Sequence, residues 1–237
     1  MARFVTVIFF AAALLMIFGG RSPANGEFTA HERVWRHRAD GSISIEVMIH
    51  AVRRDGARVT VRKQIDGRPV GNRLLIDPRR QARIVIEPRA EAKVTYPLPV
   101  SEIQALQSDP QRCGTSLDAP VETRLGFTVY RQVHNLNMAD EPLRLVRWVA
   151  PSLSCLSLQG TTTVIREGGE ELVAEYRVER VEIGEPDKSL FEVPEHYREM
   201  TPSQLMEEVS RREGRECNEC YPARMRLDEV YWSYQKR

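Results

Sequence analysis

The residues that could carry chemistry in this chain are its cysteines and histidines. Cys217 and Cys220 form a C-x-x-C pair, a spacing used in redox, haem and zinc sites. Haem attachment requires a histidine directly after the second cysteine, where Tyr221 stands. A thioredoxin-like motif follows a strand and opens a helix, whereas this pair is expected after a helix. Zinc would need two further ligands at suitable spacing, so we interpret the pair as a tail disulfide or two reduced thiols.

The remaining candidates form no recognisable site. The five histidines are His31, His37, His50, His134 and His196. Their spacing fits no metal site, and no G-x-S-x-G, H-E-x-x-H, P-loop or G-x-G-x-x-G motif occurs in the sequence. Carboxylates are plentiful, but no pair stands out from the solvated background. We therefore expect a protein that is not an enzyme, with no catalytic residue, no metal and no cofactor.

The N-terminus has the features of a secretory signal peptide. A positive charge at Arg3 precedes the uncharged apolar run Phe4–Phe18, and Ser22 and Ala24 are small residues at the −3 and −1 positions of a cleavage site. The run is shorter than the ~20 residues that a membrane-spanning helix needs. We expect residues 1–24 to be cleaved and the protein to be periplasmic or secreted. The alternative is an uncleaved segment that anchors the chain in the inner membrane.

Export places the four cysteines where disulfides persist. Four cysteines permit three connectivities, and their order favours Cys113–Cys155 and Cys217–Cys220. On the chain-entropy model, the larger loop would stabilise the fold by ~4 kcal/mol.

Charge and length exclude some classes of partner. The chain has 34 Lys and Arg against 33 Asp and Glu, for a net charge of +1. A dedicated nucleic-acid binder needs a clear basic excess, so we expect no nucleic-acid partner. The expected organisation after the signal peptide is a β domain over residues 25–200, followed by a C-terminal helix and polar tail over 201–237.

From residue 42 onward, apolar residues recur with a period of two. Turn signals at Asp55-Gly56 and Asp66-Gly67 separate the alternating runs, which predicts a meander of antiparallel strands. Strands are expected at 43–49, 59–65, 73–76, 82–87, 94–96, 122–134, 143–149, 156–166 and 172–183, with a bulge near Glu175. A short helix is predicted over 100–107. Thr201 and Gln204 predict a capping box for a second helix that ends at Gly214.

Two motifs carry a resemblance to a known class. They are Trp-x-Ala-Pro at 148–151 and Pro-Asp-x-x-Leu-Phe-x-Val-Pro at 186–194, where Leu190 and Phe191 are expected to insert into the core. Together they resemble a class of bacterial exported proteins similar in layout to the periplasmic lipoprotein-carrier (LolA-like) half-barrel superfamily. The resemblance covers roughly residues 40–200. It implies a mainly β fold: a curved antiparallel sheet, or half-barrel, with one short interior helix and C-terminal helices.

The same resemblance implies a hydrophobic concavity that accepts acyl chains. We therefore expect an exported cell-envelope protein that binds a lipid or other hydrophobic ligand in its concave sheet. The expected lining is the apolar stripe of Ile43, Ile45, Val47, Val59, Val61 and Ile84. Alternatively, this stripe packs on the two predicted helices as an ordinary core. The protein would then be a non-catalytic structural or interaction module with an envelope protein partner.

The leader generates the first prediction. N-terminal sequencing of the exported protein should find a chain that begins at Asn25, because cleavage after Ala24 fits the small residues of the site. A mature chain that still begins at Met1 would support the anchored alternative.

Overall fold

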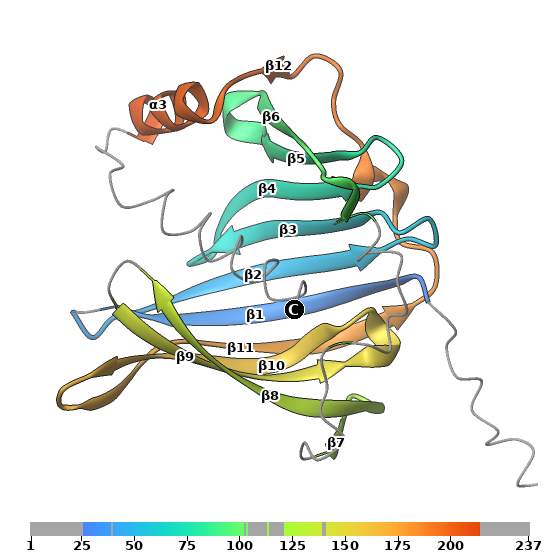
Figure 1. Ribbon diagram of the computed structural model, residues 1–237. Coiled ribbons are helices and arrows are strands. Elements are labelled where there is room, and N and C mark those ends of the chain that lie inside the picture. The colour runs from blue at the N-terminus through green and yellow to red at the C-terminus, as the bar shows by residue number, and fades with distance from the viewer. Residues whose placement is uncertain are drawn as a thin grey trace, which may run out of the picture.

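The computed structural model describes residues 26–38, 40–101, 103, 113, 121–138 and 141–213. Within them the chain forms one sheet in the order β12-β6-β5-β4-β3-β2-β1-β11-β10-β9-β8-β7 (Figure 1). The first six strands are β1 (Phe28–His37), β2 (Ile43–Val52), β3 (Arg58–Ile65), β4 (Arg68–Asp77), β5 (Ala82–Glu87) and β6 (Ala92–Pro97). The others are β7 (Val121–Arg124), β8 (Phe127–Met138), β9 (Glu141–Ala150), β10 (Leu156–Arg166), β11 (Gly169–Ile183) and β12 (Arg198–Glu199). The mainly β fold expected from the sequence is confirmed.

The sheet consists of two meanders that meet at one pair of strands. β1 is antiparallel both to its sequence neighbour β2 and to the distant β11. β12 returns to the opposite edge of the sheet, where it pairs parallel with β6.

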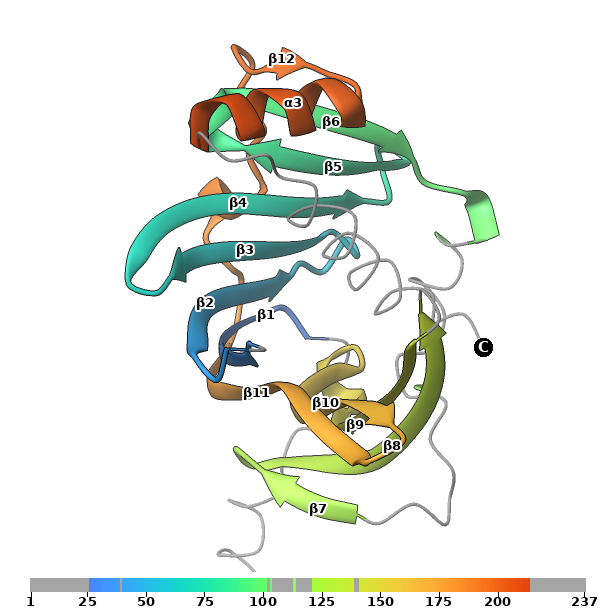
Figure 2. The same ribbon diagram turned by 90° about the vertical axis from the view of Figure 1, so that its left-hand side faces the viewer.

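The sheet curls so that one of its faces lies inside. Phe28 and Ala30 of β1 and Val178 of β11 share one buried cluster with Val129 of β8, although two further strands separate β11 from β8. Figure 2 shows both halves of the sheet turning toward the same side. We call this inner side the helix face, because helix α3 (Pro202–Glu213) packs on it.

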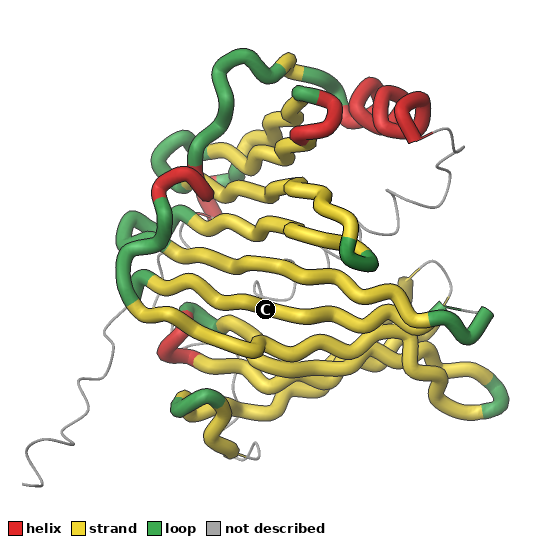
Figure 3. Tube along the Cα trace, turned by 180° about the vertical axis from the view of Figure 1, so that it is seen from behind, coloured by secondary structure: helices red, strands yellow, loops and turns green. Residues whose placement is uncertain are grey.

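The opposite side is the strap face. Residues 188–197, here called the strap, cross it after β11 (Figure 3). Phe191 is buried there among Val59, Val61 and Ile84, and Leu190 packs against them. The predicted insertion of Leu190 and Phe191 is confirmed. Arg73 reinforces the contact, since its guanidinium donates to the Ser189 and Glu192 carbonyls at 3.0 and 3.2 Å.

Helix α3 begins at the predicted capping box. The Thr201 hydroxyl accepts from the Gln204 backbone N–H at 3.3 Å, and the Gln204 side-chain oxygen accepts from the Thr201 N–H at 2.9 Å. Leu205 and Val209 bury the apolar side of the helix against β6.

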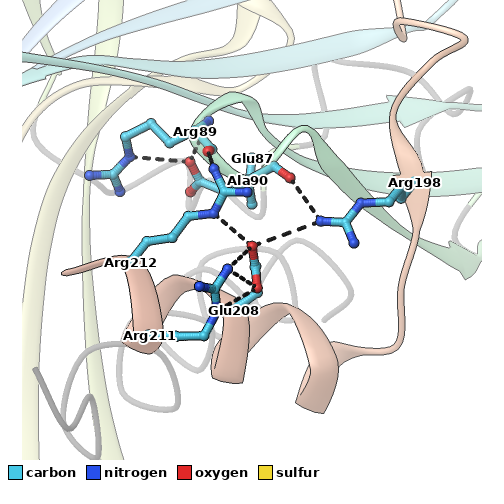
Figure 4. A network of polar contacts seen from close by, with 7 residues as sticks. All are labelled: Glu87, Arg89, Ala90, Arg198, Glu208, Arg211 and Arg212. Atoms are coloured by element: carbon cyan, nitrogen blue, oxygen red, sulfur yellow. Dashed lines mark hydrogen bonds and ion pairs between the residues drawn. The ribbon is translucent and has the colours of Figure 1, made fainter. Parts of the chain in front are cut away.

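An ion cluster fixes the end of α3 (Figure 4). Glu208 accepts from Arg211 and Arg212 and pairs with Arg198 at 3.8 Å, while Arg212 donates to the Arg89 carbonyl. Hydrogen bonds from Arg212 and then Arg211 hold the pKa of Glu208 below its usual range. The cluster therefore keeps its charges in mildly acidic solution.

Some local expectations needed correction. The first strand, β1, was not predicted. The predicted strand 122–134 is divided into β7 and β8 by a turn at Leu125 and Gly126, both of which have positive φ. The bulge expected near Glu175 is present, because the pairing with β10 shifts beside Ala174, and a second shift beside Val178 in the pairing with β1 was not expected.

Several other expectations concern segments outside the described residues. Of the predicted helix 100–107, residues 100, 101 and 103 are described, and they are helical. The signal peptide and the tail cysteines Cys217 and Cys220 lie outside the described residues, and the expected domain boundaries stay predictions. None of the helices described here has the length and apolar character to cross a bilayer.

The Cys113–Cys155 disulfide is confirmed, with 5.4 Å between the Cα atoms. Cys155 follows the short helix of Pro151–Leu153 that links β9 to β10. The bond therefore ties this turn to the segment that precedes β7.

Removing this bond should destabilise the fold. The disulfide spans 42 residues of sequence, so Cys155→Ser should lower the free energy of unfolding by about 2–4 kcal/mol. Urea denaturation of the oxidised protein and the variant measures the difference. Equal stabilities would contradict a structural role for the bond.

Candidate functional site

Buried polar side chains cross the middle of the helix face. Five of them with a charged or amide group are almost fully enclosed: Glu32 (8% exposed), Glu46 (0%), Glu87 (0%), Gln132 (7%) and Arg147 (4%). We call these five residues and their hydrogen-bonded partners the polar belt. Buried charge is expensive unless it is paired, so the partners of each group decide what the belt can do.

Glu46 on β2 is the centre of the belt. One carboxylate oxygen accepts from Arg36 Nε on β1 at 2.8 Å, and the other lies 3.1 Å from Arg62 Nε on β3. The two guanidinium groups reach Glu46 from the strands on either side of it. A fully buried carboxylate thus holds two arginines in fixed positions on the sheet.

A second group crosses the same three strands. His50 Nε2 lies 2.7 Å from Glu32 Oε2, and His50 Nδ1 lies 3.1 Å from the Thr60 hydroxyl. A carboxylate can only accept, so in a neutral ring Nε2 carries the proton and Nδ1 accepts from Thr60. The imidazole is therefore held at both nitrogens.

The ends of the belt differ in charge. On the β5 side, Glu87 accepts from Asn72 and lies 3.3 Å from Arg89 Nε. On the β9 side, Arg147 Nε donates to the neutral Gln132 side chain at 2.8 Å. The β5 end of the belt carries a paired carboxylate, and the β9 end carries a guanidinium with a neutral partner.

Strand register places the two ends on one continuous surface. Arg147 is opposite Gly160, Gly160 is opposite Tyr176, and Tyr176 is opposite Val34, which neighbours Glu46. A Cβ on Gly160 would collide with the Tyr176 ring and with the Val146 carbonyl, so only glycine lets this ring cross β10. The Tyr176 hydroxyl then meets the Ser157 hydroxyl at 2.8 Å.

The residues expected to line a ligand cavity lie on the other side of the sheet. In the register of β2, β3, β4 and β5, all six of them share the strap face. Val59, Val61 and Ile84 are buried with Phe191 of the strap. Val47 is half-buried, while Ile43 and Ile45 are 52% and 39% exposed. The structure therefore divides the predicted stripe into a covered core and an uncovered end.

Sequence reasoning did not find the polar belt. In β2 the apolar alternates were interpreted as the inner side, and the polar alternates, including Glu46 and His50, as a solvated face. One signal was present in the sequence. Glu46 and Arg147 each lie directly between two apolar residues, but alternation alone does not tell which side of a sheet is enclosed.

Comparisons with known proteins give likenesses of fold only. No protein-family profile matches the chain, and no curated protein sequence matches it either. Solved structures similar to it include PNGF-II, at 11% identity and a TM-score of 0.44, covering 78% of this chain. The Pseudomonas aeruginosa MucA/MucB complex follows at 13% identity and a TM-score of 0.40, covering 76%. The chain spans 32% and 60% of the lengths of these two matched chains.

A LolA superfamily protein from Nitrosomonas europaea is also similar, at 11% identity and a TM-score of 0.37. That match covers 72% of this chain and 91% of the other.

The burial of Glu46 generates a paired prediction. Glu46→Ala leaves Arg36 and Arg62 without their shared carboxylate, and should cost about 3–5 kcal/mol of stability. Glu179→Ala is the matched control, because Glu179 also pairs with an arginine on β1, Arg33, at 3.0 Å, but with both side chains more than 40% exposed. It should cost below ~1 kcal/mol. Urea denaturation compares the two, and similar losses would mean that Glu46 is not held as a buried ion.

Proposed function

We propose that this protein is an exported, non-catalytic interaction module of the cell envelope, which binds a polypeptide partner on its helix face. The leader-like N-terminus and the Cys113–Cys155 disulfide support export. The observation that carries the proposal is the polar belt. Charged and amide groups held in fixed positions on an inward-curved face suit a partner that offers backbone and side-chain hydrogen bonds.

The polar belt does not offer the apolar surface that an acyl chain needs. Each methylene gains ~0.8 kcal/mol when it moves from water into apolar surroundings, but the belt presents carboxylates and guanidinium groups there. Val59, Val61 and Ile84, which were expected to receive the chain, already pack against Phe191. The described side chains therefore favour a polar partner on the helix face.

A hydrophobic ligand is the second candidate, and one observation favours it. Ile43 and Ile45 are uncovered on the strap face, and Ile45 is directly opposite the half-buried Trp35. These side chains form a small apolar patch that a lipid or other hydrophobic ligand would cover.

Site-specific photo-crosslinking in the exported fraction separates the two candidates. A photoreactive residue replaces Met48, which is half-buried on the helix face between Glu32 and Arg62. A second variant carries it at Ile45 on the strap face, and a third at the exposed Glu171 as the background control.

We expect the Met48 position to yield an adduct with one polypeptide of defined mass that is absent from the other two variants. A lipid adduct at Ile45, together with saturable displacement of a fluorescent fatty acid, would favour the hydrophobic ligand. No adduct above the Glu171 background at Met48 would contradict the proposal.

A further inference from the structure

Arg147 differs from every other buried charge described on the helix face. Only 4% of it is exposed. Glu46 has two arginines, Glu32 has His50, and Glu87 has Arg89. By contrast, Arg147 has an amide as its partner, and within the described ranges no carboxylate lies within ion-pair distance of it.

The Arg147 guanidinium is held in position by a series of bonded residues. Its Nε donates to the Gln132 side-chain oxygen at 2.8 Å, and the Gln132 amide nitrogen donates to the Cys113 carbonyl. Cys113 is in turn bonded to Cys155. A chain of covalent and hydrogen bonds therefore orients Arg147, and its bonds to the described residues use one of its five N–H donors.

Among the residues that the structure describes, the neighbouring groups supply no negative charge. His134 stands on the same face of β8, opposite Leu145 of β9. Burial, and then the charge of Arg147, lower the pKa of His134, so the ring is neutral near pH 7. On the next two strands, the Ser157 hydroxyl of β10 and the Tyr176 hydroxyl of β11 bond to each other. A buried cation among neutral donors costs free energy unless an anion joins it.

We propose that Arg147 binds a carboxylate of the polypeptide partner, at a side chain or at the chain end. This inference rests on the function proposed above and names the chemical group that is recognised. The planar guanidinium presents its terminal nitrogens as a fork that matches two carboxylate oxygens. One carboxylate also balances the charge of Arg147, which has no carboxylate partner among the described residues, whereas a doubly charged phosphate would leave an excess of negative charge.

The test measures stability and binding on the same variants. Arg147→Met removes the buried charge and retains an unbranched apolar side chain. If Arg147 awaits an anion, the ligand-free variant should be at least as stable as the wild type, because a buried uncompensated ion is replaced by apolar packing. The Met48 photo-adduct of the same variant should fall at least tenfold. A purely structural arginine would instead give a lower unfolding midpoint with an unchanged adduct, which would overturn the proposal.

Two further variants keep the result interpretable if Arg147→Met does not fold. Arg147→Lys retains the charge but loses the fork and should also lose most of the adduct. Arg33→Met removes an exposed arginine of the strap face and should leave the adduct unchanged. If Arg147→Lys crosslinks like the wild type, the fork is not used and the proposal fails.

Small anions test the site without the partner. Sodium acetate should raise the melting temperature of the wild type saturably above sodium chloride of equal ionic strength, and should have no such effect on Arg147→Lys. A larger rise with inorganic phosphate would assign the site to phosphate groups and overturn the carboxylate. Absence of the Met48 adduct from the wild type contradicts the proposed function, while loss of the acetate effect alone contradicts only the role of Arg147.

Discussion

The pairing of β1 with β11 is the constraint on which the rest of this structure depends. The N-terminal meander and the C-terminal meander each satisfy their internal backbone hydrogen bonds with short connections, but the single sheet exists only because these two strands meet. The helix face becomes continuous at this seam. Glu46 lies on one side of this seam and Arg147 on the other, so neither meander alone contains the whole polar belt.

Much of the fold followed from local pattern. Period-two alternation and Asp-Gly turns located most strands of the N-terminal meander, and the capping box located α3. β1 was missed because Glu32 stands in the register of Phe28, Ala30 and Val34, where an apolar residue would have completed the alternation. Glu32, which interrupts the alternation, belongs to the polar belt and accepts a hydrogen bond from His50.

The candidate site could not be predicted from the same pattern. Alternation identifies two sides of a strand, and the usual assumption is that the apolar side is the enclosed one. In this sheet both sides are covered in part, one by the strap and one by its own curl. Consequently the apolar Ile43 is 52% exposed and the charged Glu46 is 0% exposed, which is the reverse of what their residue types suggest. Only the curvature of the whole sheet, which Figure 2 shows, tells which side is inner.

The strand order also has a consequence for how the chain is made. β1 (Phe28–His37) leaves the ribosome well before its partner β11 (Gly169–Ile183), with more than 100 residues between them. Until then the N-terminal meander carries an open edge along β1, and unpaired edges are sites of association with other chains. Contacts between residues about 150 positions apart also form slowly. The newly made protein must therefore remain unassociated for longer than either meander needs to form.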